Sequence, residues 1–330
     1  MGLPFAILLL ITNLNYEAER GDLIRIGYIS DNFPDYRNQF KADLSKEIKY
    51  NRLTDNSEKK EYDILTIGDS FSEQGPAGYQ NYLELTHGKS VLHIDYSLHN
   101  NPFQMLICLQ NSNFFEEFKI KNVVLEVVER DFIGIAANLN RDSSLNYQSL
   151  KPILKNHIEP IKTSVISNRI FKFPYYLLYR NLYPEKLVSD VYARKLKNRV
   201  FSVESKILYF YYLDVINIML NNSIDDLKFI NNILNTIGKD LKNNGVNLIV
   251  LPVPDKYHFY KNDLEYQSEF ESLLFFTNYS TLKKEYTVIN LLDAKKDNKL
   301  NVIDFYYYDD SHWSPNGSMV VAEMIFDILR

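Results

Sequence analysis

An apolar run that ends at a glycine and a serine constrains the fold of this chain more than any other feature. The run extends from Tyr62 to Ile67, and Gly68, Asp69 and Ser70 follow it directly. A continuous apolar run of this length predicts a strand buried on both faces of a parallel sheet. Gly68 lets the backbone turn sharply where the strand ends. We therefore expect the Ser70 hydroxyl at the carboxyl edge of a sheet, where α/β proteins bind ligands.

A second polar motif lies near the C-terminus, before a final helix-like pattern. It contains Asp309, Asp310 and His312. A serine hydroxyl is a poor nucleophile until an imidazole takes its proton, and a carboxylate fixes the tautomer of that imidazole. Either aspartate can supply the carboxylate from the loop that carries His312. The two motifs thus predict that both ends of the chain meet across one sheet edge, where Ser70 and His312 form a catalytic pair.

Both side chains also have structural interpretations. Ser70 could cap a helix, as serines at strand ends often do. His312 could be a structural histidine without a chemical role. With both motifs present in one chain, and with aspartates beside the histidine, we favour catalysis.

The motifs Gly68-Asp69-Ser70-Phe71 and Asp310-Ser311-His312-Trp313 resemble those of the SGNH (GDSL-like) hydrolase superfamily. Within it, they are similar to the branch of alginate and other bacterial cell-wall polysaccharide O-acetyltransferases. Two further segments fit that branch, namely Val127-Val128-Glu129-Arg130 and Pro252-Val253-Pro254-Asp255-Lys256. The resemblance covers about residues 60–330, and the motif pair is moderately specific.

The resemblance implies a role for each residue of the two motifs. Ser70 would attack an acyl donor, and His312 would act as the base. Asp310 matches the Asp-x-His spacing of the acetyltransferase branch, whereas Asp309 matches the Asp-x-x-His spacing of the wider superfamily, and we favour Asp310. The enzyme implied is an O-acetyltransferase that moves an acetyl group through a serine ester onto hydroxyls of an extracytoplasmic bacterial polysaccharide.

The chain departs from the superfamily after the third predicted strand. The usual Gly-x-Asn-Asp block, whose Asn helps to bind the oxyanion, is replaced there by Glu129-Arg130-Asp131. The backbone N–H of Ser70 is one expected oxyanion donor. Further candidates for oxyanion or substrate binding are Asn100, Asn101, Arg130, Lys256 and Trp313. Because the serine motif precedes the histidine motif, the order is closer to that of the unpermuted cell-wall enzymes, and alginate is a doubtful acceptor.

Outside the motifs, apolar runs of strand length alternate with helix-like patterns. The predicted strands are 62–67, 90–94, 123–128, 246–253 and 286–291, and the predicted helices are 79–86, 101–109, 224–243 and 315–329. Such alternation implies a mostly parallel sheet with helices on both faces. We therefore predict an α/β fold, an SGNH-hydrolase-like parallel sheet flanked by helices, with a helical insertion.

The chain divides into three predicted parts. Residues 1–14 are apolar but shorter than the roughly 20 residues that span a bilayer, and we interpret them as a membrane anchor or signal remnant. A buried first element is the alternative. Residues 15–61 are polar and are interpreted as a leader or linker rather than core. Residues 62–330 would form the catalytic domain, with an insertion at about 132–214.

The middle of the insertion is aromatic and basic, from Phe171 to Arg180, and a basic stretch follows at 194–199. This segment could bind sugar rings, rest on anionic lipid head groups or cover the catalytic edge. Ordinary amphipathic helices with solvated basic faces are the favoured interpretation.

Charge and composition exclude several classes of partner. The formal net charge is −5, so no basic excess is available to neutralise phosphates and we expect no nucleic acid. The histidines outside the C-terminal motif have no spacing that gathers metal ligands, and we predict no metal.

The resemblance implies no soluble cofactor, because enzymes of this branch usually take acetyl groups from a membrane-bound acyltransferase partner. It also implies a place on the extracytoplasmic face of a bacterial membrane, with the N-terminus as anchor.

Two other functions compete with acetyl transfer. An SGNH carbohydrate esterase, or deacetylase, would release acetate to water. A non-catalytic glycan-binding assembly protein could use the same fold, although intact Ser70, His312 and Asp310 argue against it.

Overall fold

The apolar run before the serine motif forms β2 (Glu61–Ile67), a central strand of the molecule. In the computed structural model, β2 lies between β3 (Val91–Ile94) and β4 (Lys119–Val128) and pairs with both in parallel. The register aligns Ile67 of β2 with Ile94 of β3. The carboxyl ends of neighbouring strands therefore share one edge of the sheet, as the apolar pattern predicts.

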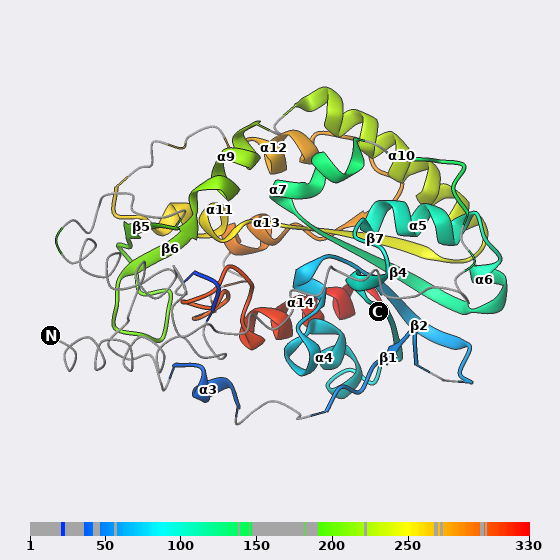
Figure 1. Cartoon of the computed structure of the whole chain (residues 1–330), viewed down its shortest axis with the longest axis horizontal. Coiled ribbons are helices and arrows are strands. Elements are labelled where there is room, and N and C mark those ends of the chain that lie inside the picture. The colour runs from blue at the N-terminus through cyan, green and yellow to red at the C-terminus, as the bar shows by residue number, and fades with distance from the viewer. Residues whose placement is uncertain are drawn as a thin grey trace, which may run out of the picture.

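The complete sheet has six strands in the order β1-β3-β2-β4-β7-β8, and all neighbouring pairs are parallel. The edge strands are β1 (Asn51–Arg52) and β8 (Thr287–Val288), and β7 (Asn247–Val253) lies between β4 and β8. Helices lie on both sides of the sheet (Figure 1). The predicted α/β fold class is confirmed, with a last strand that is shorter than the predicted range 286–291.

The structure describes residues 21–23, 36–41, 47–55, 58–137, 139–144, 146, 182, 191–220, 223–266, 270, 273–297, 300 and 302–330.

Alternate side chains of the strands enter two hydrophobic cores, one on each face of the sheet. On β2, Ile64 belongs to the first core, and Leu65 and Ile67 belong to the second. Helices α4 (Tyr79–Leu85) and α14 (Pro315–Ile328) pack in the first core. The second core is covered by α5 (Pro102–Gln110), α10 (Ile224–Asn243) and α12 (Phe275–Ser280).

Six further α-helices lie within the described part of the chain. They are α3 (Asn38–Lys41), α6 (Phe114–Glu117), α7 (Glu129–Phe132), α9 (Tyr212–Leu220), α11 (Lys256–Tyr260) and α13 (Leu291–Lys296). Of these, α7 and α11 follow the carboxyl ends of β4 and β7, so they lie at the same edge of the sheet as the serine motif.

The described C-terminal part of the predicted insertion contains an antiparallel pair of strands. β5 (Val191–Lys195) pairs with β6 (Ile207–Tyr211), which leads into α9. The sequence pattern predicts helices here, and the difference arises because β6 is an aromatic run that packs into the first core through Leu208 and Phe210. The aromatic and basic segment from Phe171 to Arg180 lies outside the described residues.

Three short described stretches of the predicted linker contribute side chains to the core, which corrects the prediction that residues 15–61 lie outside it. Leu23, Tyr36, Phe40 and Tyr50 are buried and pack in the first core. The polar composition of this region hides these isolated apolar contacts, because they do not follow a helical or strand period.

None of the described helices is long and apolar enough to cross a membrane. The predicted anchor at residues 1–14 lies outside the described residues, so it stays a prediction.

Candidate active site

Ser70, His312 and Asp310 lie in one hydrogen-bonded row at the carboxyl edge of the sheet. The Ser70 Oγ atom is 2.9 Å from His312 Nε2. On the other side of the ring, His312 Nδ1 is 2.7 Å from Asp310 Oδ1. Ser70 is exposed, whereas the side chains of His312 and Asp310 are 26% and 17% exposed. A substrate can therefore reach the hydroxyl, while the carboxylate is shielded from water.

The turn that presents Ser70 is built by Asp69. This residue caps the 3-10 helix η1 (Ser70–Ser72): its Oδ1 accepts the Phe71 N–H at 2.9 Å. Its Oδ2 accepts the Val128 N–H at 2.8 Å, which ties the turn to the end of β4. Asp69 thus acts through the backbone of the turn rather than on a substrate.

Glu126 of β4 supports the same turn from below. Its Oε2 accepts from the Asp69 N–H at 3.1 Å and from the Ser72 hydroxyl at 2.9 Å. Burial, with the nearby charge of Asp69, raises the pKa of Glu126 well above its usual value. A β-carbon at Gly68 would overlap the Ser72 and Glu126 side chains, so only glycine fits at this position.

The loop that carries His312 is fixed by the start of α14. The Ser314 hydroxyl caps that helix by accepting the Asn316 N–H at 3.0 Å, and Pro315 occupies the first helical position. Within the loop, the backbone N–H of His312 also donates to Asp310 Oδ1, at 3.1 Å. The imidazole therefore sits on a short, capped connection rather than on a free loop.

Electrostatics at the pair favour an ionised aspartate and a basic histidine. Burial alone would lower the pKa of His312, but the hydrogen bond and charge of Asp310 raise it above the usual value, and Asp22 adds to this. Burial alone would raise the pKa of Asp310, yet His312 and Arg37 hold it well below its usual range. Asp310 is thus a carboxylate at neutral pH and stabilises the imidazolium.

The second aspartate of the motif has a different environment. Asp309 is fully buried, and both of its oxygens accept from the Arg37 guanidinium at 2.9 Å. Its Oδ2 also accepts the Gly21 N–H at 3.1 Å. Of the two aspartates, the structure places Asp310 against the His312 ring.

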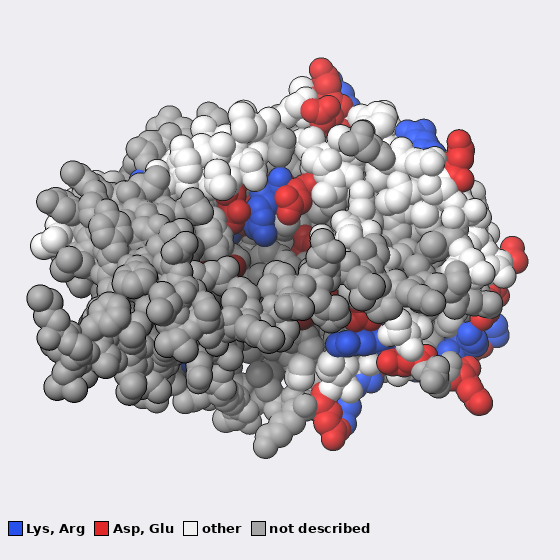
Figure 2. Space-filling model, in the orientation of Figure 1, with Lys and Arg blue, Asp and Glu red and all other residues white. Residues whose placement is uncertain are grey.

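Arg130 is near enough to His312 for its charge to act on the imidazole, but it is held by acidic side chains. It forms an ion pair with Asp255, and its Nε is 3.6 Å from Asp214 and 3.7 Å from Asp131. Burial would lower the pKa of Arg130, but these carboxylates raise it above its usual value. In Figure 2, basic side chains lie between acidic ones beside a hollow, over the position of α7 in Figure 1.

The two asparagines proposed for oxyanion or substrate binding have different surroundings. Asn101 caps α5 by accepting the Gln104 N–H at 3.1 Å, and its amide donates to the Ile135 carbonyl at 2.7 Å. Asn100 is exposed, and among the described residues neither asparagine is hydrogen-bonded to Ser70.

The prediction that Trp313 contacts substrate needs correction. Its side chain is fully buried, with Phe71 and Tyr79 packed edge-on at 5.1 and 6.1 Å between ring centroids. With the Gln74 amide turned to suit its neighbours, the indole N–H donates to it at 2.6 Å. Trp313 therefore belongs to the hydrophobic core and packs against the turn that carries Ser70.

Lys256 is buried and holds the loop that carries His312. Its ammonium group donates to the backbone carbonyls of Tyr308, at 2.8 Å, and Asp310, at 3.1 Å. The residue is 3% exposed. Burial lowers its pKa to about 7, in spite of nearby carboxylates. Lys256 is thus a structural donor beneath the loop.

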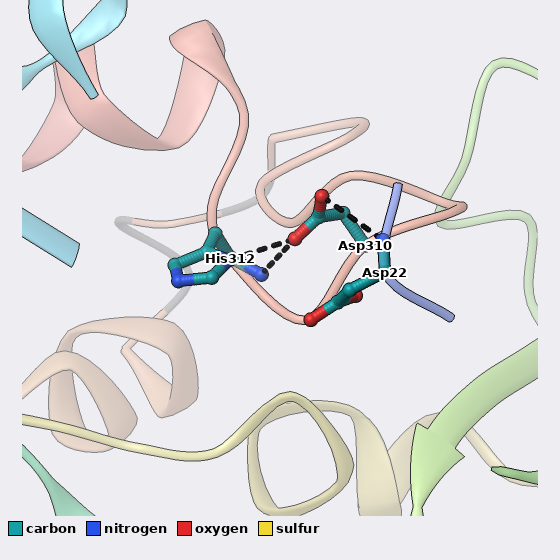
Figure 3. A group of neighbouring side chains, drawn as sticks. All are labelled: Asp22, Asp310 and His312. Atoms are coloured by element: carbon teal, nitrogen blue, oxygen red, sulfur yellow. Dashed lines mark hydrogen bonds and ion pairs between the residues drawn. The ribbon is translucent and has the colours of Figure 1, made fainter. Parts of the chain in front are cut away.

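Two N-terminal residues, Asp22 and Arg37, belong to the site although the sequence pattern gives no sign of them. Figure 3 shows His312 on one side of the Asp310 carboxylate and Asp22 on the other. Both residues lie in the stretch interpreted as a linker, where a lone aspartate or arginine is ordinary.

Among the described residues, two groups of carboxylates and imidazoles are close enough to share a cation. They are Asp22 with Asp310 and His312, and Glu73 with His93 and Asp95. In the first group, the Asp310 and His312 atoms already serve the hydrogen bonds of the triad. In the second, Glu73 Oε1 accepts from the Tyr96 N–H and faces His93 Nε2 at 3.0 Å. We assign no metal role to either group.

Comparison with known families identifies the C-terminal third of the chain. Residues 220–330 match the family model for an SGNH hydrolase-like domain of the acetyltransferase AlgX. The match covers His312, Asp310 and Lys256, and it confirms the resemblance to the SGNH acetyltransferase branch. It supports an enzyme of the esterase or acyltransferase type. Comparisons with curated proteins and with solved structures gave no match.

Proposed function

We propose that this protein is a serine O-acetyltransferase that moves an acetyl group through Ser70 onto hydroxyls of an extracytoplasmic bacterial polysaccharide. The observation that carries the proposal is the row Ser70–His312–Asp310, with contacts of 2.9 and 2.7 Å. The family match at residues 220–330 supports the acyl-transfer class.

The first half of the reaction forms an ester on Ser70. His312 Nε2 takes the hydroxyl proton as Ser70 Oγ attacks the carbonyl carbon of the acetyl donor. Asp310, bound to Nδ1, stabilises the imidazolium that results. When the tetrahedral intermediate collapses, the bond to the leaving group breaks and His312 returns the proton to that group. The acetyl group stays on Ser70 as an ester.

The second half passes the acetyl group to the acceptor. His312 is neutral again and removes a proton from a sugar hydroxyl, which attacks the ester carbonyl. Collapse of the second intermediate breaks the bond to Ser70 Oγ, and His312 returns the proton to the serine. Water can take the place of the sugar, so the ratio of transfer to hydrolysis depends on which hydroxyl occupies the site.

Both intermediates place negative charge on the former carbonyl oxygen. We assign the Ser70 backbone N–H, at the start of η1, as a donor to this oxyanion. The next amide along the chain, that of Phe71, is committed to Asp69 Oδ1 at 2.9 Å. The turn therefore uses the Phe71 N–H for its own structure, and the Ser70 N–H is the donor assigned to the reaction.

The acetyl donor and the location follow from the resemblance to this enzyme branch. We propose that a membrane-bound acyltransferase supplies the acetyl group and that the reaction takes place on the extracytoplasmic face of the membrane. No soluble cofactor is required in this scheme, because an ester or thioester donor already carries an activated acetyl group.

The test uses the full chain, because residues near its start contact the catalytic loop. Wild type and Ser70→Ala are incubated with p-nitrophenyl acetate and a mixture of sugar oligomers, and products are identified by mass spectrometry. We expect acetylated oligomers from wild type alone. Ser280→Ala, at an exposed helix end, is the matched control and should behave as wild type.

The other outcomes separate the competing functions. Release of acetate without acetylated sugar, dependent on Ser70, would favour the esterase. Absence of both turnover and an acetyl-Ser70 adduct would contradict an enzyme of this class and favour a glycan-binding role.

A further inference from the structure

The catalytic loop is held by residues that lie close to the start of the chain. Gly21 and Leu23 pair with Asp309: the Gly21 N–H donates to its carboxylate at 3.1 Å, and the Leu23 N–H donates to its carbonyl at 3.2 Å. Asp22 and Arg37 also contact the loop. We call Gly21, Asp22, Leu23 and Arg37 the N-terminal clasp.

Arg37 bridges the two carboxylates of the loop. Its Nη2 donates to Asp309 Oδ1 at 2.9 Å and to Asp310 Oδ2 at 3.1 Å. The guanidinium also lies over the Tyr307 ring, 4.0 Å from the ring centroid. A planar guanidinium can satisfy two acceptors and a ring face at once, which an ammonium cannot.

Asp22 fixes the residue that connects Asp310 to His312. Its carboxylate accepts the Ser311 N–H at 2.9 Å and the Ser311 hydroxyl at 2.5 Å. Its own backbone N–H donates to Asp310 Oδ2, at 3.4 Å. The hydroxyl of Tyr211 in turn donates to the Asp22 carbonyl at 3.0 Å, so the clasp is anchored to β6.

The two oxygens of Asp310 therefore have separate partners. Oδ1 faces the ring and backbone of His312, whereas Oδ2 faces Arg37 and the Asp22 N–H. A carboxylate held at both oxygens cannot rotate about its side-chain torsions without breaking charge-assisted hydrogen bonds. Without the clasp, adjacent Asp309 and Asp310 would also repel one another.

Resting on the proposed function, we propose that Arg37 and Asp22 are positioning residues that fix Asp310 for catalysis, so that activity requires the N-terminal clasp of the chain. They act through Asp310 and do not touch substrate. A misplacement of about 1 Å in a catalytic group costs roughly 10²-fold in rate, which sets the expected size of the effect.

The test compares Arg37→Ala, Arg37→Lys and Asp22→Asn in the full chain. We expect kcat for p-nitrophenyl acetate to fall by about 10²-fold in Arg37→Ala with KM unchanged. Arg37→Lys should recover part of this loss because it keeps the charge, and Asp22→Asn should lose less because its amide oxygen still accepts from Ser311. Arg330→Ala, which removes an exposed arginine at the other end of the chain, is the control.

A second readout does not depend on activity. The proton between His312 Nδ1 and Asp310 gives a far-downfield ¹H NMR signal when the pair is fixed. We expect this signal to broaden or vanish in Arg37→Ala and to persist in Arg330→Ala, with far-UV circular dichroism unchanged in both.

Each contrary result has a definite meaning. Wild-type kcat with an unchanged downfield signal in folded Arg37 variants would overturn the inference. A rise in KM with kcat unchanged would overturn it too, since that pattern indicates a substrate contact. If Arg37→Ala does not fold, Arg37→Lys and Asp22→Asn decide by the same criteria. If wild type itself shows no Ser70-dependent turnover, the proposed function fails, and the NMR signal still decides whether the clasp fixes the pair.

Discussion

The His312 Nε2 atom lies 2.9 Å from the Ser70 hydroxyl although 242 positions separate the two residues in the chain. The serine arrives from the end of β2, and the histidine arrives from the loop before α14. The end of a central strand and a short loop fixed by the capped start of α14 set this distance.

Replacement of His312 by alanine should remove the base without unfolding the protein. We expect kcat for p-nitrophenyl acetate to fall by about 10²–10⁴-fold, the range for loss of a general base. The side chain is 26% exposed and lies at the edge of the core, so the thermal midpoint should change little. Steady-state kinetics and a melting curve check both parts. Retention of Ser70-dependent turnover at the wild-type rate would contradict the assignment.

The pH–rate profile should report the raised pKa of His312. Burial lowers this pKa and Arg130 opposes the positive charge, but Asp310 and Asp22 more than offset both. Because His312 must be neutral to accept the serine proton, kcat/KM should rise with pH through a value above the usual histidine pKa of about 6.5. Asp22→Asn removes one of the negative charges that raise the pKa of His312. In this variant, the rise of kcat/KM with pH should therefore occur at lower pH. If kcat/KM of the variant rises at the same pH as in wild type, or at higher pH, the assigned effect of Asp22 on His312 is contradicted.

Gly68→Ala should destabilise the serine turn. The added β-carbon would overlap the side chains of Ser72 and Glu126, both of which are buried. Overpacking of this kind costs about 1–3 kcal/mol in the free energy of unfolding. Gly134→Ala is the control, because a β-carbon there meets nothing within 4 Å. Urea denaturation of the two variants should show a loss for Gly68→Ala alone.

Lys256 should leave a signature in the pH dependence of stability. Its pKa falls from 10.5 to about 7 on folding, so between these values the unfolded chain binds more protons than the folded one. Stability conferred by this residue therefore rises with pH across that window, by an amount on the order of a few kcal/mol. In Lys256→Met, this rise should be absent. The free energy of unfolding is measured for both proteins at pH 7 and at pH 10, and the increase seen in wild type but not in the variant is the contribution of Lys256. The same change in the free energy of unfolding between pH 7 and pH 10 in both proteins would contradict a lowered pKa for Lys256.

The sequence was sufficient for the parts of the fold that follow a regular pattern. The apolar runs 62–67, 123–128 and 246–253 are strands of the parallel sheet, because burial on both faces requires continuous apolar residues. The two short motifs also pointed to Ser70, Asp310 and His312, which the structure brings together. The spacing of Asp310 and His312 within one motif allows their side chains to meet.

The contacts that the sequence could not predict are those between distant polar residues. Nothing in the pattern of residues 15–61 links Arg37 to Asp309, because an arginine can pair with any carboxylate that the fold brings near it. Trp313 shows a related difficulty. An aromatic side chain beside a reactive histidine suits either a substrate surface or a core, and only its packing against Phe71 decides for the core.

The clasp also bears on the stage of folding at which the proposed reaction becomes possible. The Gly21 amide and the Asp309 carboxylate that accepts its hydrogen are 288 positions apart, and the Ser70–His312 contact spans nearly as much of the chain. Contacts between such distant residues form slowly, after the local elements have folded. A nascent chain can complete the sheet around β2 and still possess no working nucleophile. For the proposed reaction, Ser70 therefore gains its base, and Asp310 its fixed position, only after the loop at residues 309–312 has folded against the N-terminal clasp and the end of β2.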